Sequence, residues 1–291
     1  MFFKRGRVVR SSQKTRERRK MFLLRLLFLP VLLVVLVGLS AFLAHRQEVL
    51  IQDIVIEGAS AMTEADIRSA VEGPLSGTYL RLFPRANIFI YPKKVIEGSL
   101  LDEFPLLESA EVHFKNFHAI SVVVAERQPS YLWCGEVLLW DDVEAKECFL
   151  ANADGVIFTN APSFSGGVYL EFYGPVVGVS VREGNIHAAP LGFYFLPVDD
   201  FHFLTAFNDN LKGLGATPRK VSVMGDGDYS FILANGVAVL INQKQGLDAL
   251  LGNLEVALET DQLAKEDLVG ESSRLEYADI RFKNKVLYKF K

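Results

Sequence analysis

The feature that most constrains this chain is an uncharged stretch of 19 residues near its N-terminus, LLFLPVLLVVLVGLSAFLA, from Leu26 to Ala44. A helix rises about 1.5 Å per residue, so this stretch can cross a hydrocarbon layer about 30 Å thick. Pro30 lies near its start, where it should cost little because first-turn amides lack intrahelical acceptors. The sequence therefore predicts one transmembrane helix over residues 26–45.

Charged residues are distributed very unevenly on the two sides of this stretch. The first 25 residues hold ten of the 31 Lys and Arg residues but only one of the 35 Asp and Glu residues, Glu17, a net charge of +9. The other 21 basic and 34 acidic residues give residues 26–291 a net charge of −13. Basic residues favour the cytoplasmic side of a membrane helix, so we expect residues 1–25 to be a cytoplasmic tail and the rest to be exported.

Two other interpretations of this region compete with a membrane anchor. A cleaved signal peptide would have a shorter apolar run, and only Gly38-Leu-Ser40 resembles a cleavage site. The basic tail could instead bind nucleic acid, but it has almost no interleaved aromatic residues and adjoins the apolar stretch. Contact with anionic lipid headgroups of the bilayer suits it better, and we expect no nucleic-acid partner.

The first segment beyond the membrane helix alternates between strand and helix patterns. A strand is predicted over residues 51–59, and a helix begins after Thr63, which with Asp66 resembles a capping box, and ends at Gly73-Pro74. A second helix fits residues 93–103, and two strands separated by a short turn start at Ser109 and Ala119. The predicted order is β-α-α-β-β.

The remaining residues predict a mostly antiparallel β domain with two helices. Gly225-Asp-Gly-Asp228 and Asn235-Gly236 are turn signals between three strands, and Asn235-Gly236 favours a two-residue hairpin because both residues accept positive φ. Helices are expected after the capping pair Asp199-Asp200 and over residues 245–260, and a terminal hairpin closes the chain. The overall class is α+β.

The run from Phe104 to Trp133 resembles a motif of the bacterial cell-division family FtsQ/DivIB. It contains an A-x-V strand and an E-R-x-P segment before a tryptophan, and a D-G-x-x-F segment follows downstream. The turn Asn116-Phe-His118 and Tyr131 depart from the family pattern, which has Trp-Pro and Ala at these places. The residues that carry the resemblance are Ala110, Val112, Glu126, Arg127, Pro129, Trp133, Asp154, Gly155 and Phe158.

This resemblance implies a POTRA domain over residues 50–133 and an FtsQ-type β domain over residues 134–291. It also implies a single-pass protein of the plasma membrane at the division septum, which links early and late division proteins. Its partners would be FtsB-like and FtsL-like membrane proteins and, through them, septal peptidoglycan synthases. Such a protein is a scaffold and not an enzyme.

Motifs for catalysis or for binding a cofactor are missing from the sequence. The five histidines show no zinc-binding spacing, and neither G-x-x-x-x-G-K-[ST] nor G-x-G-x-x-G occurs. We therefore expect no metal, cofactor or small-molecule substrate. A membrane-tethered cell-wall enzyme such as a lytic transglycosylase remains the alternative, because 34 acidic residues outside the tail offer many carboxylate pairs. A POTRA-bearing transport component would need a following β-barrel, for which no room remains.

The two cysteines, Cys134 and Cys148, both lie in the part of the chain expected to be exported and flank an expected hairpin with its tip at Asp141-Asp142. Export places them in an oxidising compartment, and closing a loop of about 15 residues stabilises a domain by about 3 kcal/mol. We predict a disulfide, with two buried free thiols as the alternative.

The C-terminal strand is the predicted partner-binding segment. A final hairpin strand commonly leaves one edge open, and an open edge can add a strand from another chain. In the resembled family this end of the β domain is where FtsB docks, and Tyr288 is the expected anchor because Tyr is enriched at binding hot spots. The alternative is that Lys289 and Lys291 only protect an exposed edge from aggregation. The predicted binding residues are Val286, Leu287, Tyr288, Lys289 and Phe290.

Overall fold

The structure is a computed structural model that describes residues 12–136, 147–163, 167–176, 190–259, 264–283 and 285–291. The chain divides into two compact units. The N-terminal unit extends to residue 100 and includes residues 110–123, and the C-terminal unit comprises residues 101–109 and 124–291. Both helices and strands are abundant, so the α+β class is confirmed.

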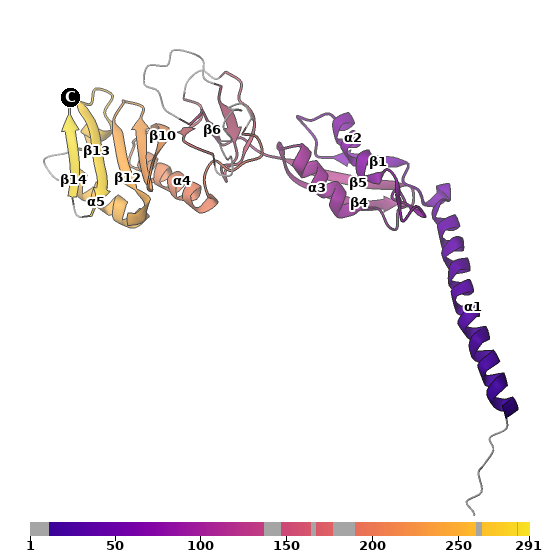
Figure 1. Cartoon of the computed structure of the whole chain (residues 1–291). Coiled ribbons are helices and arrows are strands. Elements are labelled where there is room, and N and C mark those ends of the chain that lie inside the picture. Colours follow the sequence, from indigo (N-terminus) through magenta and orange to yellow (C-terminus); the bar gives the residue numbers. More distant parts are fainter. Residues whose placement is uncertain (1–11, 137–146, 164–166, 177–189, 260–263, 284) are drawn as a thin grey trace, which may run out of the picture. The chain divides into compact units, whose positions relative to one another are not determined.

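Helix α1 (Ser12–Ala44) contains the apolar stretch, and its residues Arg18–Ala44 are long and apolar enough to cross a membrane, with a mean hydropathy of 2.9 in the most apolar window (Figure 1). The helix begins well before residue 26, so Pro30 lies in its interior. The expectation that Pro30 occupies the first turn is therefore wrong. Its ring leaves the carbonyl of Leu26 without the usual amide partner, a loss that membrane helices tolerate.

The rest of the N-terminal unit is a three-stranded sheet with two helices. The strand order is β1 (Asp53–Glu57), β5 (Ala119–Glu126), β4 (Leu107–Asn116), and β1 runs parallel to β5. The helices α2 (Glu64–Leu75) and α3 (Lys93–Glu103) separate β1 from β4 in the chain. A small hairpin, β2 (Thr78–Tyr79) and β3 (Phe83–Pro84), is inserted between them. The observed order therefore contains the expected strand, helix, helix, strand, strand sequence.

Helix α2 shows why local signals locate a helix start better than its end. The amide of Asp66 donates to the side-chain oxygen of Thr63, as an N-cap requires, at 3.3 Å. The helix continues past Gly73-Pro74 to Leu75, so the predicted end is too early. Leu75 and three other apolar residues of α2 are buried, and this packing outweighs the local cost of proline.

The C-terminal unit is built on a nine-stranded sheet, in the order β14-β13-β12-β11-β10-β9-β6-β7-β8 (Figure 1). Five of its eight neighbouring pairs are antiparallel, and the pairs β12–β13, β9–β10 and β6–β9 are parallel. The strands are β6 (Tyr131–Trp133), β7 (Phe149–Ala151), β8 (Ile157–Asn160), β9 (Glu171–Tyr173), β10 (Pro218–Gly225), β11 (Asp228–Leu233), β12 (Ala238–Asn242), β13 (Leu275–Phe282) and β14 (Lys285–Phe290).

Two long helices pack on this sheet and bury its core. Helix α4 (Val198–Gly213) contacts β10, and α5 (Leu247–Glu259) contacts β13, β14 and α4. Pro197 is the N-cap of α4, so Asp199 and Asp200 lie in its first turn and are not the cap that the sequence predicts. A short third helix, α6 (Lys265–Val269), was not predicted. The largest fully buried side chains of this core are Phe172, Phe195, Phe201, Phe207 and Phe231.

The two predicted turns differ in geometry. At the first, Asp226 (φ 54°) and Gly227 (φ 81°) both have positive φ between the paired residues Gly225 and Asp228, which makes a two-residue hairpin. At the second, Gly236 (φ 84°) has positive φ but Asn235 does not, and the loop is longer. The two-residue prediction for Asn235-Gly236 is therefore wrong. The Asn235 side chain donates to the carbonyls of Leu268 and Gly270 at 2.8 and 3.0 Å, which explains its conformation.

The boundary between the predicted modules also shifts. Tyr131–Trp133, assigned from the sequence to the first module, form β6 in the sheet of the C-terminal unit. The amides of Leu132 and Cys134 donate to the carbonyls of Leu170 and Phe172 at 3.0 and 2.9 Å. These bonds were not predictable because the residues are far apart in the chain.

Candidate protein-binding edge

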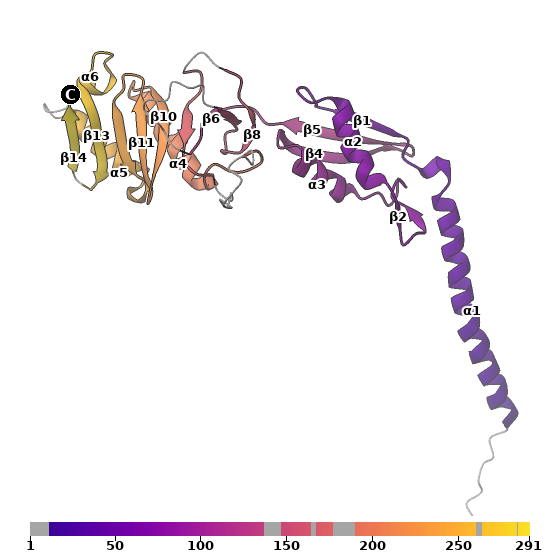
Figure 2. The same cartoon turned by 45° about the horizontal axis from the view of Figure 1, so that its top comes forward.

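The predicted binding strand β14 lies at one end of the nine-stranded sheet (Figure 2). It runs antiparallel to β13, with Ala278 opposite Tyr288 and Asp279 opposite Leu287. Among the described residues, β14 has β13 as its single strand neighbour. The terminal hairpin that the sequence predicts is therefore present, with β14 as an edge strand. An edge strand presents one row of backbone groups on the side away from its neighbour.

The backbone direction along β14 identifies which residues face the open side. The amide of Lys291 donates to the carbonyl of Arg274 at 2.7 Å, so Lys291 faces β13. Successive residues of an antiparallel strand direct their N–H and C=O groups to alternate sides. The two β-bulges in this pairing are extra residues of β13, one between Leu275 and Tyr277 and one between Asp279 and Phe282. They add no residue to β14, so its backbone groups keep alternating between the two sides. Leu287 therefore also faces β13, whereas the backbone groups of Val286 and Phe290 point toward the open edge.

The two faces of β14 differ in what covers them. Val286 and Tyr288 are half-buried and pack against the core on the side of α5. Leu287 has 44% of its side chain exposed on the other face, next to Lys289. The domain itself therefore covers part of one face of β14 and leaves the other face exposed. Tyr288, the expected anchor, uses part of its ring for this internal packing and contacts the ring of Phe290 at a centroid distance of 5.7 Å.

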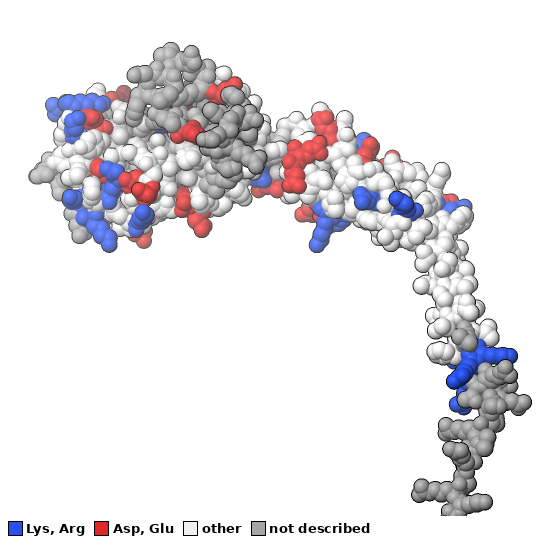
Figure 3. All heavy atoms as spheres, viewed as in Figure 1, with Lys and Arg blue, Asp and Glu red and all other residues white. Residues whose placement is uncertain are grey.

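Basic residues surround the open edge. Lys289 pairs with Glu276 at 2.6 Å, and the hydrogen bond to this carboxylate raises the pKa of Lys289. Lys285 lies over the ring of Phe282, with its ammonium 4.8 Å from the ring centroid. Figure 3 shows blue side chains gathered at the end of the C-terminal unit where β14 lies. This charge favours an acidic partner segment.

A partly buried ion network fixes the strands behind β14. Arg281 donates to both carboxylate oxygens of Asp279 at 2.9 and 2.7 Å and to Asp228 on β11 at 2.6 Å. Burial raises the pKa of Asp228, but hydrogen bonds from Asn242 and Arg281 outweigh it and hold the pKa below its usual value. The same carboxylates raise the pKa of Arg281. The network ties β11 to β13 and so supports the edge. The network could not be predicted from local patterns, because Asp228 and Arg281 are 53 residues apart in the chain.

The predicted disulfide is present at the other end of the sheet. The Cα atoms of Cys134 and Cys148 are 4.2 Å apart and their sulfurs are bonded. The expected hairpin tip at Asp141-Asp142 lies outside the described residues. Trp133 donates its indole N–H to the carbonyl of Gly174 at 3.0 Å, which fixes β6 next to the disulfide.

The other motif residues lie apart from the edge and have structural roles. Ala110 and Val112 are buried on β4, and Phe158 is buried on β8. Arg127 follows β5, donates to the carbonyls of Pro105 and Leu106, and precedes Gln128-Pro129 before β6. Glu126 is the last residue of β5.

The Asp154-Gly155 turn packs on α4. Asp154 contacts His202 at 3.0 Å. Gly155 has a φ of 80°, and a Cβ there would lie 2.9 Å from the ring of Phe201, so this position requires glycine. These motif residues therefore support the fold and do not form one site with β14.

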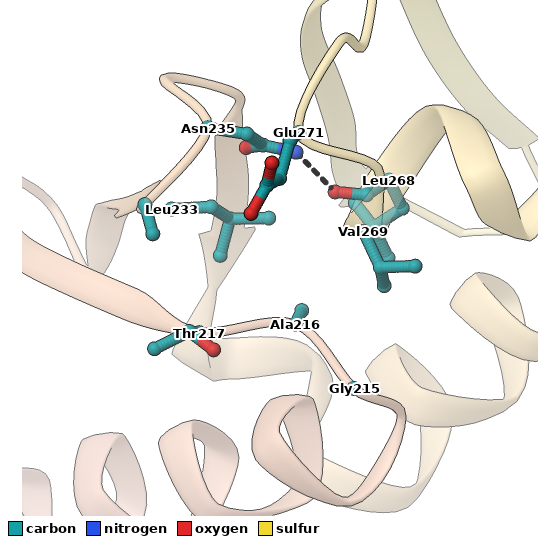
Figure 4. Close-up of a pocket in the computed structure, with 9 residues that line it drawn as sticks. Gly215, Ala216, Thr217, Leu233, Asn235, Leu268, Val269 and Glu271 are labelled. Carbon is teal, nitrogen blue, oxygen red and sulfur yellow. Dashed lines mark hydrogen bonds between the residues drawn. The ribbon is translucent and has the colours of Figure 1, made fainter.

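A hollow of about 360 Å³ lies between the end of α4 and α6 (Figure 4). Figure 4 shows Asn235 directed at the backbone of Leu268 and Glu271 beside the opening. Its described lining residues include a single carboxylate and no histidine, cysteine or basic residue. Across the described parts of the chain, no group of three or more His, Cys, Asp or Glu residues could hold a metal ion. The described lining therefore does not bring together a pair of groups for acid–base or nucleophilic chemistry.

Comparison of the chain with protein-family models gives no match, and comparison with curated proteins gives none either.

Proposed function

We propose that this chain is a membrane-anchored, non-enzymatic scaffold of the FtsQ/DivIB type, which binds other membrane proteins of the bacterial division machinery. The observation that carries the proposal is the open edge of β14 at the C-terminal end of a large sheet. An extended segment of a partner would pair with the backbone of this edge, and the lysines around it would attract an acidic partner.

The N-terminal unit supports the same assignment. Its order of one strand, two helices and two strands, with β1 parallel to β5, is the arrangement expected of a POTRA domain from the resemblance. In this proposal the POTRA domain helps to place the protein at the division septum. The β domain then binds FtsB-like and FtsL-like proteins, which position septal peptidoglycan synthases.

The proposed location is the plasma membrane, with the N-terminus in the cytoplasm and both units outside. Helix α1 supports the anchor by length and composition, and the net charge of +9 on residues 1–25 supports the orientation. The disulfide agrees with an oxidising compartment. External protease added to intact spheroplasts should digest both units, and their protection would contradict this topology.

Paired proline substitutions test strand addition at β14. Val286→Pro removes an N–H that points to the open edge, whereas Leu287→Pro removes one that points to β13. Val286→Pro should reduce co-purification of FtsB-like and FtsL-like partners about ten-fold, since each lost hydrogen bond contributes about 1 kcal/mol and the partner must also avoid the ring. It should lower the thermal unfolding temperature only by the packing that the half-buried Val286 side chain provides, and by less than Leu287→Pro, which breaks the pairing with β13.

Val286→Thr is the matched control, because it keeps the N–H and the branched shape. It should retain the partners. If Val286→Pro keeps its partners at the level of the unsubstituted chain, strand addition at β14 is wrong, and the lysines would then only protect the edge from aggregation.

The non-enzymatic part of the proposal has its own test. The purified chain is incubated with peptidoglycan, and released fragments are measured. No turnover above that of a heat-unfolded sample is expected. Turnover that disappears on substitution of one carboxylate would replace the scaffold by a cell-wall enzyme.

A further inference from the structure

Three exposed phenylalanines of the N-terminal unit form an aromatic cluster, Phe89, Phe114 and Phe117. Their exposed fractions are 68%, 54% and 57%. The ring centroids of Phe89 and Phe117 are 6.1 Å apart, and those of Phe114 and Phe117 are 5.8 Å apart. Single exposed apolar residues are common, but three contacting aromatic rings on a surface indicate something that covers them.

Hydrogen bonds hold this cluster close to the C-terminal end of α1. The side chain of Asn87 donates to the carbonyl of Ala44, the last residue of the helix, at 3.0 Å, and its oxygen accepts from the amide of Phe89 at 3.0 Å. On the other side of the cluster, the carbonyl of His118 accepts from the amides of Gln52 and Asp53 at 2.8 and 3.1 Å. The segments that carry Phe89 and Phe117 are therefore both hydrogen-bonded either to the last residue of α1 or to residues no more than nine positions beyond it.

The β2–β3 hairpin adds an exposed apolar tip at the same end of the helix. Strand β3 contacts α1, and Figure 2 shows β2 beside the end of that helix. The tip carries Leu80, which is 87% exposed, and Leu82. Leu80 and Arg81 both have positive φ, 50° and 60°, a costly conformation for side chains of this size. The hairpin thus directs a leucine outward at a cost in backbone strain.

Basic side chains accompany these apolar ones. Lys115 separates Phe114 from Phe117, and Arg81 separates Leu80 from Leu82. Arg85 follows β3 and lies over the ring of Tyr79 at 5.4 Å. Aromatic and aliphatic residues mixed with Lys and Arg are typical of segments that lie in the interfacial layer of a membrane.

The length of the apolar stretch places this surface at that layer. Leu26–Ala44 rises about 28 Å at about 1.5 Å per residue, close to the thickness of a hydrocarbon core. Ala44 then lies at the boundary between hydrocarbon and headgroups. Because Asn87 bonds directly to Ala44, the aromatic cluster lies within a few side-chain lengths of that boundary.

We propose that the aromatic cluster and the tip of the β2–β3 hairpin insert into the interfacial layer of the bilayer that α1 spans. They would hold the N-terminal unit in one orientation on the membrane surface. The inference rests on the membrane anchor of the proposed function, but not on its division partners. A bilayer is favoured over a protein partner because the cluster is tied to the end of a membrane-spanning helix and is mixed with basic residues.

Photolabelling by lipid tests this proposal on the full chain in vesicles of phosphatidylcholine and phosphatidylglycerol. A lipid with a diazirine near the headgroup is activated, and tryptic peptides are analysed by mass spectrometry. Label is expected in the α1 peptide 26–46 and also in peptides 86–93 and 116–127, which contain Phe89 and Phe117. Peptide 221–244 of the C-terminal unit, which contains the exposed Met224, gives the background.

The triple variant Phe89→Ser, Phe114→Ser, Phe117→Ser should reduce label in 86–93 and 116–127 to the level of 221–244, while 26–46 stays labelled. The control pair Val168→Ser, Val256→Ser removes exposed apolar side chains of the C-terminal unit that lie outside all of these peptides, and it should change the label of neither peptide. If peptides 86–93 and 116–127 of the unsubstituted chain carry only as much label as 221–244 while 26–46 is labelled, the proposed insertion is wrong but the membrane anchor stands. If 26–46 is also unlabelled, both the insertion and the membrane anchor are wrong.

Discussion

The two units of this protein place their aromatic side chains in opposite ways. In the C-terminal unit five phenylalanines are fully buried, and their rings contact one another on the inner face of the large sheet. In the N-terminal unit the fully buried side chains are aliphatic, such as Ile67, Ile96 and Ile120, and phenylalanine is exposed at the end that adjoins α1. Phenylalanine therefore contributes to a core in one unit and to a surface in the other.

The size of the two sheets accounts for part of this difference. Nine strands covered by α4 and α5 leave a layer wide enough for contacting rings, whereas three strands with two short helices enclose a smaller volume that Ile, Leu and Val fill. Three phenylalanines that this small core does not bury lie exposed at the end that adjoins α1, where the proposed insertion into a bilayer would give them a function. Measurements of the stability of variants in both units test this difference.

The largest effect is expected for Phe207→Ala in the C-terminal core. Phe207 is fully buried and contacts Phe231 at a centroid distance of 5.1 Å. Its truncation should lower the free energy of unfolding of this unit by about 3–5 kcal/mol, measured in detergent by urea unfolding. The comparison variant Phe117→Ala, more than half exposed, should change stability by less than about 0.5 kcal/mol. Similar losses for the two variants would contradict the assignment of opposite roles.

The next largest loss of stability is expected from removing the disulfide. The bond closes a loop with a sequence separation of 14, for which the chain-entropy model gives about 3 kcal/mol. The double variant Cys134→Ser, Cys148→Ser should lower the free energy of unfolding of the C-terminal unit by about this amount. The transition of the N-terminal unit should not move. A shift of both transitions together would show that the two units unfold as one.

Arg281→Met should cost about 1.5–3 kcal/mol at neutral pH, because it leaves the buried carboxylate of Asp279 and the partner Asp228 without their cation. The pKa of Asp228 is lowered in the fold, so its contribution is complete above about pH 4 and is lost as the pH falls through the folded pKa. The difference between the variant and the unsubstituted chain should therefore narrow below about pH 4. A difference that stays constant down to acid unfolding would mean that Arg281 stabilises by packing alone.

Most elements were predictable from the sequence because their signals are local. The capping pair at Thr63, the period of α5 and the positions of β4 and β5 depend on neighbouring residues, although β4 begins two residues before its predicted start. The prediction of the disulfide depended on there being two cysteines. Where local signals failed, a distant contact had intervened. Asn235 was expected to adopt positive φ, but its side chain bonds to Leu268 and Gly270 instead.

The candidate surfaces were predictable to different degrees. The edge position of β14 could be expected from its place at the end of a hairpin, but the coverage of one face by α5 could not. The aromatic cluster could not be predicted from the sequence, because Phe89 and Phe117 are 28 residues apart in the chain. The alternating pattern of β4 also does not show which face of the strand is left without a packed helix. Residues 80–90 show neither the period of a helix nor the alternation of a strand.

The smallest expected effect tests whether the N-terminal unit unfolds by itself. Thr63 caps α2 through its side-chain oxygen, and its hydroxyl also donates to the carboxylate of Asp66 at 2.6 Å. Thr63→Ala should lower the free energy of unfolding by about 1 kcal/mol, whereas Thr63→Ser keeps the oxygen and should cost much less. Because α2 buries four apolar residues in the aliphatic core, this loss should appear in the transition of the N-terminal unit. Amide hydrogen exchange can assign it, since protection should fall in α2, β1 and β5 but stay unchanged in β10, β11 and β12. Equal loss of protection in both sets of strands would show that the two cores, aliphatic and aromatic, do not unfold separately.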